Sequence, residues 1–454
     1  VRYHAPESAV DLLEAPDVVL VDEAAALPVR RLERLLAAPA VAFTTTVHGY
    51  EGAGRGFSVR FRDRLEESDH DLTELTMTEP IRYARGDPVE VWAFRALLLD
   101  ARPPVEPLVA EATPATATYR RLSADALLAD RHLLREAFGL LVMAHYRTEP
   151  GDLARLLDAP NVAVRALTHE GHVVAVALLA REGGLDEETR ERMYRGQRVR
   201  GNMIPDVLST QLRDERAGVP VGHRILRIAT HDAVRSRGLG SRLLGEIRAE
   251  FAAAVDWLGV GYGVTPELVA FWRANGYAIV HLSTTRNDTS GEYSAVMLDP
   301  CSPAGRRLVE RHTGRFRDRI GAVLPDALDD CDPDVVRGCL RAVDGVPEPA
   351  LSEWEWRLLA GIPGGASVLD TNPEPLARLS LRHLVAPADP DALADREERL
   401  LVRKVLQARP WPAVSEALGF VSPRACKRTV GDIVETLLTE YAKPWVHEES
   451  DRLC

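Results

Sequence analysis

The chain has 454 residues, of which 46% are hydrophobic and 27% charged, and its formal net charge is −12. These values exclude a disordered or fibrous chain, and the length suggests roughly three folded units. Five scattered cysteines without a CxxC pair argue against a disulfide framework or a zinc ribbon, and no apolar run approaches the ~20 residues that cross a bilayer. We therefore expect a cytoplasmic protein without a membrane segment, and no feature indicates an obligate protein partner.

The first hundred residues predict an α/β arrangement. A β-branched run at 18–21 ends in Asp22 and Glu23, a helical pattern follows, and a second strand at 40–46 runs into a glycine-rich loop at 48–56. In RecA-like ATPases an acidic pair at a strand end holds Mg²⁺, while a lysine-bearing P-loop cradles the phosphates. Asp22 and Glu23 fit the acidic half, although a solvated strand end has the same pattern.

No GxxxxGK[ST] motif occurs in the sequence, and the chain begins at Val1 rather than at a methionine. We expect the P-loop to lie upstream of Val1. Residues 1–100 should therefore bind ATP poorly by themselves.

Composition and periodicity change along the rest of the chain. A stretch rich in Pro, Ala and Thr at 101–118 predicts a linker between residues 1–100 and an α/β module at 119–300, and the strand signals fade in the tail, 301–454. Within the module we expect a hairpin of two strands around Glu170 and Gly171. The remaining predicted elements are helices up to 144, after 150, at 240–253 and 266–275, strands at 225–230, 257–264, 277–283 and 294–298, and tail helices at 397–406, 411–418 and 430–441.

The turn from Arg235 to Gly240 has the pattern R-x-x-G-x-G between a predicted strand and a predicted helix. Glycines let the backbone approach a pyrophosphate closely, and the N–H groups of a helix N-terminus point at the anion. Two glycines are also common in any tight strand-to-helix turn. The helix at 266–275 and the Asn-Gly-Tyr turn that ends at Tyr277 favour the acetyl-CoA interpretation, because both are typical of GNAT acetyltransferases.

Several motifs in order resemble one known family, the tRNA cytidine acetyltransferases (TmcA and its eukaryotic RNA cytidine acetyltransferase relatives). The matching segments are 22–28, 44–57, 79–83, 227–231 and 287–294. The resemblance implies the C-terminal part of a RecA-like helicase module, a GNAT domain and a helical RNA-binding tail. It also implies transfer of acetyl from acetyl-CoA to the exocyclic amine of a cytidine in tRNA, giving N4-acetylcytidine, at the wobble position of elongator tRNA-Met. In the intact enzyme this transfer would be coupled to ATP hydrolysis.

The resemblance also implies site residues. Arg82 resembles the family's ATP-contacting arginine, and Mg²⁺ would be held through Asp22. Family members usually carry an arginine two residues after a Phe-Trp pair, whereas here Trp272 is followed directly by Arg273. The expected acetyl-CoA contacts are Ile228, Ala229, Thr230, Arg235, Ser236, Arg237, Gly238, Leu239, Gly240, Ser241, Glu267 and Arg273.

The acceptor amine is a poor nucleophile, so a base is expected to take its proton. Glu267 and His231 are the candidates, although Glu267 also suits a helix start and His231 a turn after a strand. Two basic clusters are candidates for tRNA phosphates, and each is equally compatible with a solvated helix face. The RNA-binding candidates are Arg306, Arg307, Arg311, Arg315, Arg424, Lys427 and Arg428.

Two other functions remain open at this point. A GNAT enzyme that acetylates a protein amine would carry the same turn, and so would a non-catalytic RNA-binding module with a degenerate acetyl-CoA fold. The motifs at 22–57 disfavour the first, and the intact 235–240 turn disfavours the second. Other RNA besides tRNA could also serve as acceptor.

Overall fold

A computed structural model describes residues 2–4, 16–24, 27, 29–45, 61–77, 79, 81, 84–143, 150–287, 291–364 and 367–453. The chain divides into two compact units. Unit 1 comprises Val1–Val260 and Asn287–Glu292, and unit 2 comprises Gly261–Arg286 and Tyr293–Cys454. No helix among the described residues is both long and apolar enough to span a membrane.

The N-terminal part of unit 1 contains the two predicted strands. β1 (Val19–Val21) pairs in parallel with β2 (Val41–Phe43), and α2 (Val29–Leu35) connects them. Val21, Leu32 and Phe61 form a small buried core with their neighbours. α4 (Arg62–Glu66) and α5 (Pro88–Ala96) follow. The predicted loop at 48–56 and Arg82 lie outside the described residues.

Seven strands make up the main sheet, in the order β3-β4-β5-β6-β7-β9-β8. Its strands are β3 (Thr118–Leu122), β4 (Val162–His169), β5 (His172–Glu182), β6 (Gly222–Thr230), β7 (Trp257–Gly263), β8 (Ala278–Leu282) and β9 (Ser294–Pro300). The predicted hairpin is confirmed, because β4 and β5 are antiparallel and their turn places Glu170 at φ 49° and Gly171 at φ 90°. The boundary between the two units falls within β7.

Helices pack on the strands of unit 1. α7 packs on β5 and β6, and α11 packs on β4, β5 and β6. The helices are α6 (Ala124–Ala129), α7 (Arg131–Met143), α8 (Pro150–Asp158), α9 (Glu187–Tyr194), α10 (Met203–Thr210) and α11 (Leu239–Phe251). β3, α9 and α10 were not among the predicted elements, whereas the helix predicted at 240–253 is confirmed as α11.

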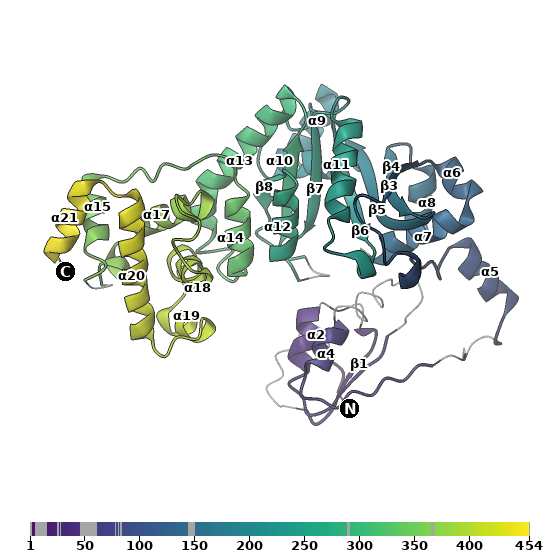
Figure 1. The fold of residues 1–454 in the computed structure, drawn as a ribbon, viewed down its shortest axis with the longest axis horizontal. Coiled ribbons are helices and arrows are strands. Elements are labelled where there is room, and N and C mark those ends of the chain that lie inside the picture. Colours follow the sequence, from purple (N-terminus) through teal and green to yellow (C-terminus); the bar gives the residue numbers. More distant parts are fainter. Residues whose placement is uncertain are drawn as a thin grey trace. The chain divides into compact units, whose positions relative to one another are not determined.

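Unit 2 is mainly helical beyond its strands, as the fading strand signals predict (Figure 1). Leu400, Val430 and Leu437 lie in the core that the tail helices share. Its helices are α12 (Pro266–Ala274), α13 (Pro303–Val323), α14 (Pro333–Arg341), α15 (Glu353–Ala360), α16 (Ser367–Thr371), α17 (Glu374–Val385), α18 (Asp395–Leu400), the π-helix η5 (Leu401–Leu406), α19 (Trp411–Ala417), α20 (Pro423–Tyr441) and α21 (Pro444–Leu453).

The segment predicted as a linker is packed in unit 1. Ala101, Val109, Ala112 and Ala117 are buried, and η3 (Glu106–Leu108) forms a short turn within it. A Cβ on Gly139 of α7 would lie 2.5 Å from the backbone of Arg102, so this segment runs directly against α7. We call residues 101–117 the 101–117 segment. The division of the chain into 1–100, 101–118, 119–300 and 301–454 stays a prediction.

Candidate functional site

The strand β6 changes its pairing where the predicted acetyl-CoA contacts begin. Its parallel ladder with β7 joins Gly222–Ile225 to Trp257–Val260, and β6 continues for five more residues beyond it. On the other edge, β5 stays paired up to Thr230, with a bulge that leaves Leu226 as the extra residue of β6. Ile228, Ala229 and Thr230 are half-buried. The end of β6 therefore presents backbone along the edge that faces away from β5.

The turn after β6 contains two residues in the left-handed region of backbone conformation. η4 (Asp232–Val234) leads into Ser236, which has φ 59°, and Gly238 has φ 84° and is the N-cap of α11. Left-handed residues in a turn can direct backbone N–H groups toward one concave side, where an anion can bind. A left-handed residue before α11 requires a glycine or costs a non-glycine residue about 1–2 kcal/mol. The R-x-x-G-x-G pattern thus has the local structure that the sequence predicts.

The first N–H groups of α11 precede its first intrahelical hydrogen bond. That bond runs from the Arg242 N–H to the Gly238 carbonyl, at 2.9 Å. Within the described part of the chain, the N–H groups of Leu239, Gly240 and Ser241 have no backbone acceptor. N–H groups at a helix start, together with the positive end of the helix dipole, attract phosphate oxygens. The turn can therefore hold a pyrophosphate.

The two arginines of the turn have different surroundings. Arg235 forms an ion pair with Asp232, with 2.7 Å between Nη2 and Oδ1. Arg237 donates from Nη1 to the Ala110 carbonyl, at 2.5 Å. Both side chains are exposed, so both can reach an anion at the turn by rotamer changes. Arg237 also ties the turn to the 101–117 segment.

His231 is buried and both of its ring nitrogens are engaged. The Ala233 N–H donates to Nδ1 at 3.2 Å, and Nε2 lies 2.7 Å from the Pro104 carbonyl oxygen. A carbonyl only accepts, so Nε2 carries the proton and Nδ1 has none to give. The backbone N–H of His231 donates to the Val174 carbonyl of β5. These contacts favour a positioning role, because neither nitrogen has a lone pair directed at a substrate.

The remaining donor-site candidates lie in unit 2, on α12. Glu267 is exposed in the first turn of the helix, after the N-cap Thr265, and Arg273 is exposed in the last turn. Six residues separate them, which is about 9 Å along a helix axis. The structure therefore does not bring Glu267 and Arg273 to one point.

The predicted ATP-site carboxylate lies at the edge where β1 and β2 end. Asp22 accepts a hydrogen bond from the Thr44 hydroxyl, at 2.7 Å, and from the N–H of Glu23, at 3.1 Å. Glu23 has φ 49°. Parallel strands bring their carboxyl ends together, and this edge is where α/β sheets bind nucleotides. Thr44 is the partner that sequence reasoning left unassigned.

The two basic clusters differ in how their side chains are used. On α13, Arg306, Arg307 and Arg315 are exposed and Arg311 is half-buried, while Leu308, Phe316 and Ile320 face the core. On α20, Arg424 and Arg428 are exposed, but Lys427 pairs with Asp370 at 3.0 Å and lies over the Trp411 ring. The α13 arginines therefore form the larger exposed basic surface.

Sequence reasoning missed the contacts that the 101–117 segment makes with the turn. Pro104, Ala110 and Pro114 meet His231, Arg237 and Gly238 respectively, and Pro114 Cγ would lie 3.5 Å from a Cβ on Gly238. Backbone carbonyls and proline rings carry no chemical signature. Their role could not be found from residue types.

Comparisons with known proteins identify the related families. The model described as RNA cytidine acetyltransferase NAT10/TcmA, helicase domain, matches residues 1–100, and the model GNAT acetyltransferase 2 matches 136–253 and 242–302. tRNA(Met) cytidine acetyltransferase TmcA of Haloarcula marismortui is 72% identical over 452 residues, and that alignment covers 100% of this chain and 58% of the relative. For the TmcA of Haloferax volcanii the identity is 63%, with 100% and 60% covered.

Among solved structures, the ribosomal-protein-S18-alanine N-acetyltransferase of Escherichia coli is similar over 41% of this chain and 94% of that one, at 16% identity and a TM-score of 0.28. The chain spans about three fifths of the length of the curated relatives it matches. The predicted fold class, with a helicase-type part, a GNAT α/β domain and a helical tail, is confirmed. The chain belongs to the TmcA family of RNA cytidine acetyltransferases.

Proposed function

We propose that this chain transfers acetyl from acetyl-CoA to the exocyclic amine of a cytidine in tRNA, giving N4-acetylcytidine. The observation that carries the proposal is the turn between β6 and α11, with Ser236 and Gly238 in the left-handed region, in a chain that is 72% identical to a protein named tRNA(Met) cytidine acetyltransferase. We place the target at the wobble position of elongator tRNA-Met. Other RNA is a further candidate acceptor.

The donor would lie along the end of β6 with its pyrophosphate on the turn. Backbone groups at 228–230 would align the pantetheine arm and the thioester, while the N–H groups of 239–241 would hold the phosphates. Acetyl-CoA supplies an activated acyl carbon. The protein contributes orientation, because no side chain is needed to form a covalent intermediate.

The transfer itself requires the loss of one proton. The cytosine N4 amine attacks the thioester carbon, a tetrahedral centre forms, the C–S bond breaks, and the amine proton leaves while the CoA thiolate takes up a proton. Conjugation with the ring makes this amine a weak nucleophile, so holding it against the thioester should supply much of the rate enhancement. Glu267 is exposed and remains the candidate base, whereas we assign His231 a positioning role.

ATP use is proposed for the N-terminal part. Asp22, oriented by Thr44 and the Glu23 N–H, would hold Mg²⁺, and Arg82 would contact ATP. The Mg²⁺ would neutralise phosphate charge during hydrolysis. We propose that the complete enzyme couples this hydrolysis to acetyl transfer.

The tRNA would contact the exposed arginines of unit 2. Arg306 and Arg307 have no ion-pair partner among the described residues, so their charges can neutralise phosphates. A base must leave its stack before an enzyme can act on it, which suits the unpaired nucleotides of an anticodon loop. We propose a cytoplasmic location, where tRNA is the substrate at hand.

Nucleoside analysis tests this proposal. This chain, and in parallel a protein as long as its relatives, is incubated with labelled acetyl-CoA, ATP, Mg²⁺ and transcribed elongator tRNA-Met, and the digested RNA is analysed for N4-acetylcytidine. We expect label in that nucleoside, and its loss when the wobble cytidine is replaced by uridine. Label in protein but not in RNA would overturn the proposal and favour a protein N-acetyltransferase.

A further inference from the structure

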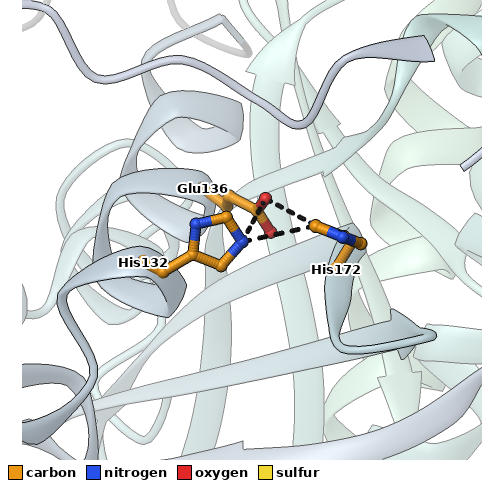
Figure 2. A group of neighbouring side chains, drawn as sticks. All are labelled: His132, Glu136 and His172. Atoms are coloured by element: carbon orange, nitrogen blue, oxygen red, sulfur yellow. Dashed lines mark hydrogen bonds and ion pairs between the residues drawn. The ribbon is translucent and has the colours of Figure 1, made fainter. Parts of the chain in front are cut away.

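Two histidines and a glutamate converge in unit 1 near the start of β5. His132 and Glu136 lie one turn apart on α7, and His172 is the first residue of β5 (Figure 2). Glu136 Oε1 lies 2.8 Å from His132 Nε2 and 2.9 Å from His172 Nδ1, and these two nitrogens are 3.3 Å apart. Three atoms that can each bind a metal ion, one from each side chain, therefore lie within 3.3 Å of one another.

The carboxylate of Glu136 is buried, with 5% of its side chain exposed. Its second oxygen, Oε2, accepts the N–H of Val173 at 2.9 Å, which fixes the plane of the carboxylate. A buried charge is tolerated only when it is paired. In the described part of the chain its partners are this N–H and the two imidazoles, and a cation held among the three groups would balance its charge.

The surroundings of the group resemble those of a metal site. The Val173 N–H orients the carboxylate from behind, as outer-shell donors do for metal-binding carboxylates. His132 is 61% exposed and His172 is 20% exposed, so the open side of the group faces solvent. An ion could enter from this side and keep a water molecule as a further ligand.

The separations fit a small transition-metal ion. Tetrahedral Zn²⁺ binds nitrogen and oxygen at about 2.0–2.2 Å, which places neighbouring ligand atoms about 3.3 Å apart. The two nitrogens already have this separation, and Oε1 would retreat by about half an ångström. Two imidazoles and one carboxylate suit zinc and its neighbours, whereas Mg²⁺ and Ca²⁺ prefer oxygen ligands.

We propose that His132, Glu136 and His172 bind a divalent transition-metal ion of the zinc type, with water at the remaining position. The ion joins α7 to the turn between β4 and β5. Two residues after His172, the Val174 carbonyl accepts the N–H of His231, the residue that follows β6. The bound ion would thus link two elements next to the acetyl-CoA site. This proposal does not depend on the acetyl-transfer proposal.

Calorimetry with metal alone tests the site. The 454-residue chain is freed of metal with a chelator and titrated with Zn²⁺ and, separately, with Mg²⁺. We expect a single Zn²⁺ per chain and no comparable Mg²⁺ binding at this site. His132→Ala should weaken Zn²⁺ binding about tenfold or more, because it removes a direct ligand, and Glu136→Gln should do the same while keeping an acceptor for the Val173 N–H. His447→Ala, outside the group, is the matched control and should bind like the parent chain.

A second readout separates a metal site from a hydrogen-bonded triad. Co²⁺ bound by two imidazoles, a carboxylate and water in a tetrahedral site gives a strong visible absorption band. We expect this band in the parent chain and in His447→Ala, and its loss in His132→Ala, with far-UV circular dichroism checking that the metal-free variant is folded. Equal Zn²⁺ affinity in the parent chain and His132→Ala, or no binding by the parent chain, would overturn the proposal and leave the triad as a hydrogen-bonded tie.

Discussion

The Nε2 of His231 donates a hydrogen bond to the carbonyl oxygen of Pro104, at 2.7 Å, across 127 residues of sequence. The Ala233 N–H occupies the other ring nitrogen and fixes the tautomer. The residue that follows β6 is therefore hydrogen-bonded to the 101–117 segment. Substitutions at His231 can show whether this residue positions the turn or acts as the catalytic base.

We expect His231→Ala to raise the KM for acetyl-CoA about tenfold or more and to lower the free energy of unfolding by ~1–3 kcal/mol, because the Pro104 carbonyl and the Ala233 N–H lose their partner. His231→Gln can still donate toward Pro104 and should partly restore both values. Steady-state kinetics and urea unfolding measure them. If His231 were instead the catalytic base, both variants would lose ~10²–10⁴-fold in kcat, and the KM for acetyl-CoA would be unchanged.

Gly238→Ala should weaken acetyl-CoA binding through backbone strain. A Cβ there meets Pro114 at an ordinary contact distance of 3.5 Å, so the main effect is the left-handed φ of 84°. Shifting this residue by a few tenths of an ångström misaligns the N–H groups at 239–241, and we expect an affinity about tenfold weaker by calorimetry.

Gly419→Ala is the matched control for this variant. Its φ is 65° and nothing lies within 4 Å of the added Cβ, so it carries similar strain away from the turn. We expect it to lose a similar ~1–2 kcal/mol in the free energy of unfolding, with acetyl-CoA affinity unchanged. Equal affinities in the two variants would contradict a phosphate-binding turn at Gly238.

Exposed arginines on α13 should set the salt dependence of tRNA binding. The double variant Arg306→Ala with Arg307→Ala removes up to two phosphate contacts, so the slope of log affinity against log salt should fall by about 1–2. Filter binding across a salt series measures this slope. Arg452→Ala removes a charge that already pairs with Glu449 and should leave the slope unchanged.

The helices and strands that the sequence predicts correctly are those that adjacent residues determine. The apolar run of β5 and the Glu170-Gly171 turn indicate a hairpin, and Gly238 followed by an apolar helical period indicates the start of α11. β3 escaped prediction because its sequence is Thr-Tyr-Arg-Arg-Leu, which has no buried alternation. Its tyrosine, Tyr119, donates to Glu250 of α11 at 2.6 Å, a partner 131 residues away.

The candidate site likewise has parts that the sequence could locate and parts that only the tertiary structure brings together. The 235–240 turn could be located from its glycines and arginines, because the backbone conformation of a turn depends on adjacent residues. His132 and Glu136 lie at i and i+4 on one helix and were not singled out from the sequence, because His172 joins them only through the packing of α7 on β5. The carbonyls of Pro104 and Ala110 belong to every residue type, so no sequence signal marks them.

Acid should destabilise the protein through a buried histidine of unit 2. Burial, followed by the charges of Arg319 and His312, lowers the pKa of His281 to about 4, and Arg319 donates to its Nδ1 at 3.0 Å. An unfolded histidine titrates near ~6.5, so the unfolded state takes up this proton first. Stability is therefore lost as pH falls from about 6.5 to about 4, by ~1.4 kcal/mol per pH unit at most.

Urea unfolding between pH 7 and pH 4 measures this loss. His281→Asn keeps an acceptor near Arg319 but does not titrate, so its free energy of unfolding should fall less steeply with pH. His223 in unit 1 has a pKa lowered to about 4 by burial and by Arg181 and Arg165, so part of the slope will remain. Parallel pH profiles for parent and variant would contradict the assignment.

The helices α14 and α18 are joined by an ion cluster around the buried carboxylate of Glu398, and breaking one arm of it should destabilise unit 2. Arg337 pairs with Glu398 and donates to Asp334 and Asp395, at 2.7 and 2.5 Å, while Arg341 also reaches Glu398, at 2.7 Å. Glu398 is 1% exposed, so Arg337→Ala leaves a buried carboxylate with one arginine in place of two. We expect a loss of ~3–5 kcal/mol in the free energy of unfolding, measured by urea titration.

The loss in the free energy of unfolding when an ion pair is broken depends on how exposed the pair is to solvent. Arg452→Ala breaks a pair whose arginine is 79% exposed, and it should change the free energy of unfolding by less than ~0.5 kcal/mol. Replacing Arg337 and Glu398 together by leucine should recover much of the loss seen in Arg337→Ala, since an apolar pair leaves no buried charge behind. If the double variant is less stable than Arg337→Ala, the ion pair between Glu398 and Arg341 contributes more to the free energy of unfolding than the pair between Glu398 and Arg337.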